Sequence, residues 1–372
     1  MSETEDDSED AQLPPVLKAS VHDLRYFATL LRGVNFVNRA TVTIAKTGVV
    51  VVVEEARTLL GTAYIFADIF DEYIYHPDPS TSVALSQNSD DDEDNAVFEI
   101  PLNTLIECLN IFGTAGASSG SAAGGGGGTG RYTKWKRAGD DSDQEAGGDD
   151  DRRRSNANTR GIDQYFGSAS DKGTGMRMTY AGSGFPLTLL IAEDATGPTT
   201  TCEITTYEAE PHLQLLFEAD RMVLKIILKS SWLRDALAEL DPSCEKLTFI
   251  GNPPPANDGR QRDRPRAPGA PPMLRIQAAG TFGSTEMDYP NDRDVLETFE
   301  CTQPVRFSYR VGHIARTLRA LQSSTKTSLR IDDAGLLSLQ FLMPAPRTQA
   351  KPAGASDGFI EFRCLALDDE VA

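Results

Sequence analysis

The sequence has few cysteines, no long apolar run and no excess of basic residues. Its five cysteines lie far apart and form no C-x-x-C pair, which disfavours a structural zinc site and a disulfide scaffold. The longest apolar runs are far shorter than the roughly 20 residues of a membrane-spanning helix. The acidic first residues have no cationic start followed by an apolar stretch, so we expect no secretory signal. These absences predict a soluble intracellular protein with reduced thiols.

The net charge of −19 is concentrated in short acidic runs. Residues 1–10, 90–94 and 140–151 hold 18 of the 55 acidic residues, which leaves 37 acidic against 36 basic residues elsewhere. Runs of like charge repel themselves and stay solvated. The rest of the chain is nearly neutral, so the net charge does not exclude a basic stripe that meets nucleic acid.

Several segments lack the apolar residues that a core needs. Residues 114–175 hold 15 of the 31 glycines and, among Val, Ile, Leu and Met, only Ile162. Such a stretch cannot bury enough apolar surface to offset the entropy of ordering it, so we expect a disordered insertion. Residues 1–15 are expected to form an acidic disordered tail, and 251–272 and 344–357 to form loops. About 260 residues remain, which suits two domains of average size.

The remaining segments are rich in strand patterns. Alternation at Thr41–Ala45, a tight turn and the run Val49–Val53 predict a hairpin. Further strands are expected at Gly61–Ala67, Ala96–Ile100, Met176–Tyr180, Leu187–Glu193, Thr201–Tyr207, Lys246–Ile250, Met273–Ala278, Thr281–Met287, Val305–Arg310, Ser328–Ile331, Leu336–Leu342 and Phe359–Leu367. Antiparallel sheet is therefore expected to dominate.

Four segments have the apolar spacing of helices instead. They are Val21–Arg32, Leu102–Phe112, Trp232–Leu240 and Val311–Gln322. Aligning Leu24 with Leu233, and Leu105 with Ile314, gives the same offset of 209 residues. The repeated order indicates an internal duplication, in which the four helices would line a common surface.

Six segments of the sequence resemble a known family. They are the hairpin at 41–55, Met176–Tyr180, Gly184–Leu190, Thr281–Ser284, Met287–Pro290 and Thr327–Phe341. In this order they resemble the Rad-one family, whose members are subunits of the heterotrimeric nine-one-one checkpoint clamp of the sliding-clamp superfamily. The insertion at 114–175 departs from the family, which has a short loop there.

The resemblance implies an α+β sliding-clamp fold with two pseudo-repeated domains, antiparallel outer sheets and four inner helices. The first domain would span 16–207, the interdomain linker 208–219 and the second domain 220–368. The implied function is that of a non-enzymatic subunit in a heterotrimeric ring that encircles DNA at damage sites and recruits checkpoint signalling and repair factors.

The implied partners are two related clamp subunits, double-stranded DNA bound without sequence specificity, a clamp loader, and checkpoint and repair proteins. No cofactor, metal or membrane is implied. The resemblance places the protein in the nucleus. Two basic clusters, Lys134–Arg137 and Arg152–Arg154, fit a bipartite import signal or, equally simply, a charge-balanced linker.

A ring that moves along DNA needs diffuse attraction to phosphates without base readout. Basic residues on the expected inner helices would supply it, unless they are ordinary solvated helix charges. The candidate DNA-facing residues are Arg25, Arg32, Lys229, Arg234, Arg316, Arg319 and Lys326.

Ring closure would use one sheet edge at each end of the subunit, because an unpaired edge accepts a strand from another chain. The resemblance places these edges at Thr199–Thr206 and Thr281–Tyr289; the alternative is that both are internal strands. The candidate interface residues are Cys202, Ile204, Thr206, Phe282, Thr285 and Met287. Proline at Ile204 or at Thr285 would then remove one partner each.

Two other functions remain open. A 3′-to-5′ DNA exonuclease would need carboxylates that converge on divalent ions, and the candidates are Glu54, Glu55, Asp68, Asp71 and Glu72. A homotrimeric replication processivity clamp would have the same fold but would assemble from one chain.

Overall fold

The order of strands and helices occurs twice along the chain. The computed structural model describes residues 14–77, 95–113, 173–193, 197–254, 272–290, 292–346 and 357–368. Most of the expected tail, insertion and two loops, and both basic clusters of the import signal, lie outside these residues. No helix among the described residues is long and apolar enough to cross a membrane.

The first repeat begins at β1 and ends at β9. Its elements are β1 (Leu17–Val21), α1 (Arg25–Gly33), β2 (Arg39–Ala45), β3 (Gly48–Glu55), β4 (Leu59–Phe66), the 3₁₀ turn η1 (Ala67–Ile69), β5 (Glu72–Tyr75), β6 (Ala96–Pro101), α2 (Leu102–Leu109), β7 (Gly175–Tyr180), β8 (Leu187–Ala192) and β9 (Thr199–Ile204).

The second repeat has the same order. After η4 (Ala219–Arg221) come β10 (Met222–Lys229), α3 (Ser230–Ala238), β11 (Cys244–Gly251), β12 (Leu274–Gly280), β13 (Gly283–Tyr289), β14 (Leu296–Cys301), β15 (Val305–Arg310), α4 (Val311–Ala315), α5 (Leu318–Ser323), β16 (Lys326–Asp332), β17 (Leu337–Met343) and β18 (Gly358–Cys364).

The sheets repeat as well. The first repeat has a five-stranded order β5-β1-β7-β8-β9 and a four-stranded order β4-β3-β2-β6; the second has β14-β10-β16-β17-β18 and β13-β12-β11-β15. Every pairing between named strands in the described residues is antiparallel. The described part is therefore an α+β fold of duplicated, antiparallel sheets, as the patterns predict.

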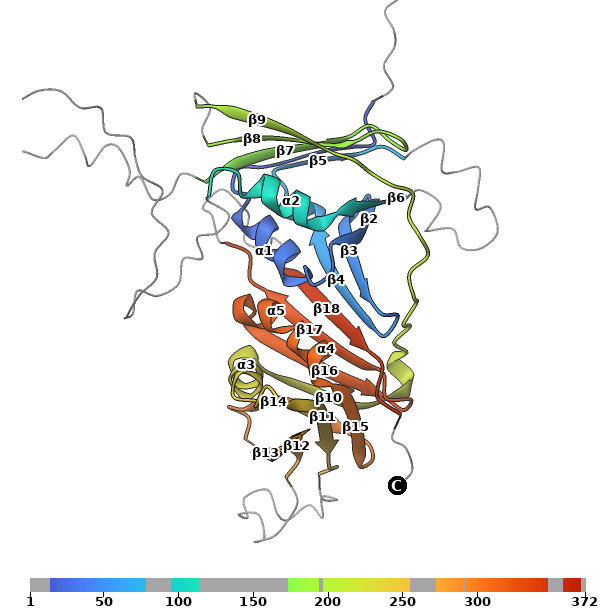
Figure 1. Cartoon of the computed structure of the whole chain (residues 1–372), viewed down its shortest axis with the longest axis vertical. Coiled ribbons are helices and arrows are strands. Elements are labelled where there is room, and N and C mark those ends of the chain that lie inside the picture. Colours follow the sequence, from blue (N-terminus) through green and yellow to red (C-terminus); the bar gives the residue numbers. More distant parts are fainter. Residues whose placement is uncertain are drawn as a thin grey trace, which may run out of the picture. The chain divides into compact units, whose positions relative to one another are not determined.

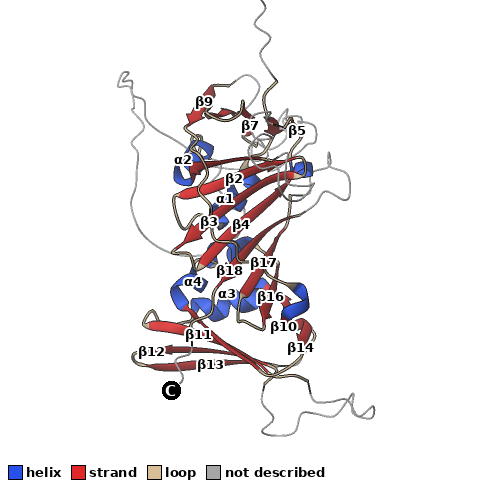
Figure 2. Ribbon diagram, turned by 90° about the vertical axis from the view of Figure 1, so that its right-hand side faces the viewer, coloured by secondary structure: helices blue, strands red, loops and turns tan. Residues whose placement is uncertain are grey.

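The two repeats are joined edge to edge. Strand β18 of the second repeat pairs with β4 of the first, from Phe359 opposite Tyr64 to Cys364 opposite Leu59. This pairing merges a five-stranded and a four-stranded sheet into one of nine strands (Figure 2). Figure 1 shows β18 beside β4, with α1 and α5 on either side of the junction.

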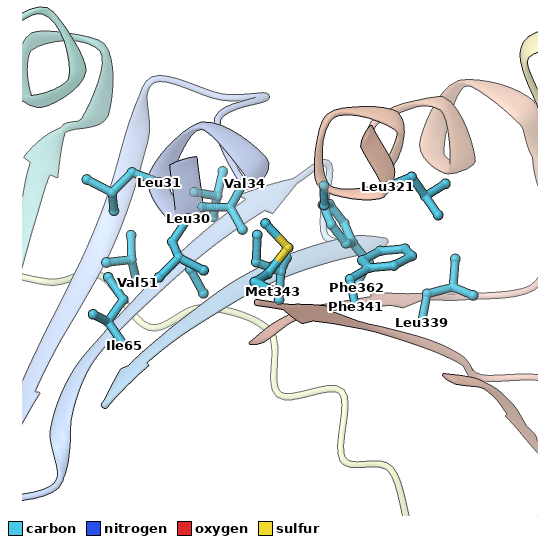
Figure 3. Packing of buried hydrophobic residues seen from close by; sticks show 14 of the residues in the cluster. Leu30, Leu31, Val34, Val51, Ile65, Leu321, Leu339, Phe341, Met343 and Phe362 are labelled. Carbon is cyan, nitrogen blue, oxygen red and sulfur yellow. The ribbon is translucent and has the colours of Figure 1, made fainter. Parts of the chain in front are cut away.

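One hydrophobic cluster crosses this junction. Its members include Leu30 and Leu31 of α1, Val34 just after this helix, and Phe341 and Phe362 of β17 and β18, all at most 1% exposed. Figure 3 shows the side chains of both repeats in contact above the joined strands. Burial of this continuous apolar surface stabilises the pairing of the repeats in addition to the strand ladder.

The predicted hairpin is confirmed, with β2 and β3 joined by a tight turn. Gly48 closes it with φ +147, and a Cβ at this position would lie 2.2 Å from the Ile65 carbonyl oxygen. Only glycine meets both conditions without strain. The other predicted strands are also present; β15 has the predicted ends, Val305–Arg310, and the rest have one or both ends shifted by a few residues.

Four strands were not predicted: β1, β5, β10 and β14. Strand β5 has four residues and none is fully buried, so it lacks a clear alternation. The fourth predicted helix is broken into α4 and α5 at Arg316 and Thr317. The first helix begins at Arg25 rather than Val21, because Val21 is the last residue of β1.

Candidate DNA-facing helices and free sheet edges

The helices of both repeats form a row. Helix α1 contacts α2 and α5, and α5 contacts α3, so the order along the row is α2, α1, α5, α3. Figure 1 shows the same sequence of helices. The predicted DNA-facing residues lie on or beside this row, with Lys229 and Lys326 directly opposite each other at the ends of β10 and β16.

Several of these basic residues are paired with nearby acids. The pairs are Arg25 Nη2 with Asp23 Oδ2 at 2.6 Å, Arg234 Nε with Asp235 Oδ1 at 3.1 Å, and Lys326 Nζ with Glu297 Oε2 at 2.8 Å. Asp23 is only 18% exposed and accepts several hydrogen bonds from Arg25. The Arg234 and Lys326 pairs are exposed and are worth little, about 0–1 kcal/mol, because water competes for both partners. A phosphate group would therefore be able to displace the carboxylate at small cost.

Arg316 and Arg319 connect the two repeats. Arg316 donates two hydrogen bonds to the Glu55 carboxylate, at 3.0 Å from Nε and 2.8 Å from Nη2, and Arg319 Nη1 donates to the Asn35 carbonyl oxygen at 3.1 Å. The hydrogen bonds to Glu55 raise the pKa of Arg316 above its ordinary value. Both arginines therefore have a structural partner across the junction, which their helical positions alone do not indicate.

Strand β9 is the last strand of its five-stranded sheet in the described residues, next to β8. Ile204 is 2% exposed and packs into the core, while Cys202 is half-buried at its edge. Just beyond the strand, the Thr206 hydroxyl donates to the Phe185 carbonyl oxygen at 2.8 Å. One side of this strand thus has no neighbouring strand within the described chain.

Strand β13 has the same status in the four-stranded sheet, next to β12. Met287 packs against the core, whereas Phe282 in the preceding turn is 88% exposed. On the solvent side, Arg275 pairs with Glu286 at 2.6 Å and with Asp288 at 2.6 Å. Both predicted edge segments are therefore terminal strands, and their use by partners stays a prediction.

The connection between the repeats is anchored to the first repeat by Glu99. This side chain is 5% exposed, accepts the Glu210 backbone N–H at 2.8 Å and pairs with Arg39. Glu99 and Tyr207 also exchange two backbone hydrogen bonds of 2.9 Å. The pattern of the sequence gave no signal for Glu99, because its partners are distant in the chain.

The same connection is anchored near the junction by two further hydrogen bonds. The Leu213 N–H donates to Glu54 Oε2 at 2.7 Å, and Arg363 Nη1 donates to the Leu215 carbonyl oxygen at 2.7 Å. Leu215 also packs in a small apolar cluster with residues of both repeats. The connection is thus held by both repeats.

A buried charge network lies beside the junction. Glu361 of β18 is 3% exposed and accepts hydrogen bonds from Ser338 Oγ at 2.7 Å and Arg363 Nη2 at 2.9 Å. Arg330 Nη2 is 3.5 Å from the same carboxylate, and Glu361 is opposite Thr62 of β4. Burial raises the pKa of Glu361, but Arg363 and Ser338 lower it more, so the net pKa is below its ordinary value.

The carboxylates of the exonuclease alternative do not converge. Glu54 accepts from Leu213, Glu55 from Arg316, Asp71 from His22 and Glu72 from Lys18. Asp68 lies in η1. Among the described residues, no group of three acids, histidines or cysteines is placed to hold a metal ion.

Cys108 and Cys364 are not activated as nucleophiles. Burial raises the pKa of Cys108 to about 11 and that of Cys364 to about 12, so both thiols are protonated at neutral pH. His313 Nδ1 lies 3.6 Å from Cys364 Sγ, and burial lowers the pKa of this histidine. All five cysteines are free thiols.

The sequence comparisons agree with this arrangement. Residues 16–343 match the model of the family described as "Repair protein Rad1/Rec1/Rad17". The chain therefore belongs to the Rad1/Rec1/Rad17 family, and the resemblance inferred from its segments is confirmed.

Three relatives illustrate the family. The chain is 29% identical to "DNA repair exonuclease REC1" of Mycosarcoma maydis, with 96% of this chain and 97% of that protein covered. It is 28% identical to "Cell cycle checkpoint protein RAD1" of Homo sapiens, with 95% and 93% covered. It is 26% identical to "DNA damage checkpoint control protein rad1" of Schizosaccharomyces pombe, with 86% and 79% covered.

Proposed function

We propose that this protein acts in the DNA-damage checkpoint as a non-enzymatic subunit of a heterotrimeric ring clamp. The ring encircles double-stranded DNA at damage sites in the nucleus, is placed there by a clamp loader, and recruits checkpoint signalling and repair proteins. The names of the human and fission-yeast relatives support the checkpoint role. The row of helices would form the inner surface and the sheets the outer one.

The junction between β18 and β4 carries the proposal. It shows how the five-stranded sheet of one repeat extends the four-stranded sheet of another. Strand β9 is the equivalent of β18 in the first repeat, and β13 is the equivalent of β4 in the second. Neither has a second neighbouring strand among the described residues. A head-to-tail contact of this kind generates a ring when the rotation closes.

Comparison with the junction indicates which backbone N–H groups of β9 face a partner. Leu187 is opposite Ile204 and Leu337 is opposite Cys364 at the start of the two equivalent strand pairs, so Ile204 matches Cys364 and Cys202 matches Phe362. The Leu365 N–H donates to the Thr58 carbonyl oxygen. Because N–H directions alternate along a strand, the Glu203 N–H is expected to point to the partner.

The β13 edge follows from the same comparison. The turns between Glu55 and Leu59 and between Gly280 and Gly283 are equivalent, so Met287 matches Ala63 and Glu286 matches Thr62. The Ala67 N–H donates to Thr47 of the β2–β3 turn, so by alternation the Thr62 N–H faces β18. We therefore expect the Glu286 N–H to face the second partner.

The mass of the assembly tests the proposal. The purified chain is expected not to form a trimer by itself, and to form a complex of three different chains when both related subunits are added. Light scattering on each mixture gives the mass. A stable homotrimer of this chain would support the replication-clamp alternative and contradict the heterotrimer.

Reversing the charge of Lys229 and Arg234 is expected to weaken the hold of the assembled ring on duplex DNA. Each phosphate contact contributes roughly −0.9 to the slope of the logarithm of the binding constant against the logarithm of the salt concentration. Loss of two contacts should therefore make this slope less negative by about 2. These residues suit the test better than Arg316 and Arg319, whose replacement would also disturb the junction with Glu55 and Asn35.

Arg306→Glu is the matched control for this measurement. Arg306 is exposed and hydrogen-bonds Gln277 on the sheet, away from the row of helices, so its reversal should leave the slope unchanged. If Lys229→Glu/Arg234→Glu gave the parental slope, these residues would not face DNA.

The exonuclease alternative is kept because one relative is named an exonuclease. We expect no release of nucleotides by the purified chain with magnesium or manganese, because Asp71 and Glu72 are occupied by His22 and Lys18. Gel electrophoresis of end-labelled duplex measures the release. Turnover that disappeared in Asp71→Ala/Glu72→Ala would contradict the non-enzymatic role.

A further inference from the structure

Tyr26 of α1 seals the junction between the repeats. Its hydroxyl donates to the Met343 carbonyl oxygen at 2.7 Å and accepts the Gly358 N–H at 2.8 Å. These two groups are the last residue of β17 and the first residue of β18. One aromatic side chain from the four-stranded end of the first repeat therefore contacts the two strand ends of the five-stranded sheet that docks there.

Helix α3 is the counterpart of α1 in the second repeat. The alignment of Leu24 with Leu233 that the sequence suggested is wrong by about one helical turn. The Leu24 N–H donates to the Thr174 carbonyl oxygen and the Ser230 N–H to the Thr325 carbonyl oxygen, and Thr174 and Thr325 are equivalent because each lies six residues before the residue opposite the start of the next strand. Leu24 therefore matches Ser230, and the buried residues Phe27, Leu30 and Leu31 match Leu233, Ala236 and Leu237. The residue before the first member of each set is Tyr26 in α1 and Trp232 in α3. Trp232 thus holds the position of Tyr26.

The surroundings of Trp232 agree with this match. Its carbonyl oxygen accepts a hydrogen bond from the Tyr289 hydroxyl at 3.3 Å, and Tyr289 is the last residue of β13. Tyr289 of β13 matches Ile65 of β4. Ile65 follows Tyr64, which lies close to Gly358 at the end of the junction that Tyr26 contacts. Trp232 therefore stands at the same end of the free edge.

The difference is in exposure. Tyr26 is partly buried by contacts with the second repeat, whereas Trp232 is 44% exposed. Large exposed aromatic residues that become buried on association contribute much of the binding energy at protein interfaces. Within the described residues Trp232 keeps this exposure, so its indole is available to a partner.

We propose that Trp232 is the aromatic anchor for the related clamp subunit that pairs with β13. This inference rests on the proposed ring. Trp232 would contact two strand ends of that subunit, the ones equivalent to the end of β17 and the start of β18 in this chain. Because an indole has one N–H donor and no acceptor, it makes only the first of the two Tyr26 hydrogen bonds, to a backbone carbonyl oxygen, and adds apolar contact area.

The affinity of each related subunit for variants of the full chain tests the anchor. The β13-side subunit is identified as the one that Glu286→Pro no longer binds. Trp232→Ala should weaken binding of that subunit at least about thirtyfold, as for an interface hot spot, and should leave the other subunit within about twofold. Trp232→Tyr should restore most of the affinity, because the chain itself places tyrosine at the equivalent position.

Two controls accompany these variants. Leu216→Ala removes another exposed apolar side chain, in the connection between the repeats, and should bind both subunits normally. Thermal unfolding of Trp232→Ala should match the parent, because an exposed side chain stabilises little. A lower melting temperature together with loss of both subunits would overturn the anchor in favour of a structural role.

A spectroscopic measurement reports burial directly. The chain has two tryptophans, so Trp135→Phe with 5-fluorotryptophan leaves one fluorine signal, from Trp232. Addition of the unlabelled β13-side subunit should shift this signal and remove its sensitivity to the H₂O/D₂O ratio; the other subunit should do neither.

The outcomes separate the anchor from the ring. If the parent chain bound both subunits, but Trp232→Ala bound the β13-side subunit within twofold and the fluorine signal did not move, the anchor would be wrong while the ring stood. If the parent bound neither subunit, the proposed function itself would fail. A shift on addition of unlabelled copies of this chain alone would overturn the choice of occupant.

Discussion

Replacing Glu361 with alanine is expected to lower the free energy of unfolding by about 3–5 kcal/mol, the usual cost of removing one partner from a buried ion pair. The substitution leaves Arg330 and Arg363 beside each other without their shared carboxylate. It also leaves Ser338 without its acceptor. Urea unfolding of the full chain, followed by circular dichroism, measures the change from the midpoint and slope.

Two further variants are compared with Glu361→Ala. Glu361→Gln keeps a hydrogen-bond acceptor for Ser338 but loses the charge, so its cost should lie between that of alanine and the parent. Glu300→Ala removes an exposed glutamate that pairs with Lys225 and should change stability by less than about 1 kcal/mol. Equal effects of Glu361→Ala and Glu300→Ala would show that the buried network is not stabilising.

The pH dependence of stability should change in the same variant. The pKa of Glu361 is depressed below its ordinary value of 4.5 in the folded protein. Its contribution is therefore complete above that value and is lost as the pH falls through the lower folded pKa. The parent should lose stability below about pH 4.5 more steeply than Glu361→Gln, and parallel profiles would contradict this.

The second large effect concerns the free edges. Glu203→Pro is expected to abolish binding of one related subunit, and Glu286→Pro binding of the other, because proline removes the N–H that each edge offers to its partner. The two effects should be independent, since β9 and β13 belong to different sheets. Pull-downs of each variant against each subunit measure them.

These proline substitutions lie one residue from Ile204 and Thr285, the positions chosen from the sequence. By the alternation of N–H directions, Ile204 and Thr285 donate to the inner neighbours β8 and β12. Ile204→Pro and Thr285→Pro would therefore break a ladder within the chain and lower its melting temperature, which Glu203→Pro and Glu286→Pro should leave nearly unchanged. Loss of both subunits in either edge variant, or of neither, would reject the edge assignment.

Most of the local elements and the duplication follow from short-range patterns in the sequence. Alternation at Thr41–Ala45 and helical spacing at Leu102–Phe112 depend on neighbours within a few residues, so the patterns give β2 and α2 correctly. The match of Leu105 with Ile314 predicts the repeat because both residues are buried in equivalent helices. Short or partly exposed strands such as β5 gave too little pattern.

The contacts between distant strands and between distant charges depend on how the whole chain folds. Glu55 and Arg316 are 261 residues apart, yet they form a bidentate pair at the junction, and no local pattern encodes that contact. The side chain of Glu361 is charged and would be expected on the surface, but pairing with Arg363 allows its burial. The physical reason is that such pairs depend on which edges join, and that is decided by the apolar surface buried across β4 and β18 rather than by any one segment.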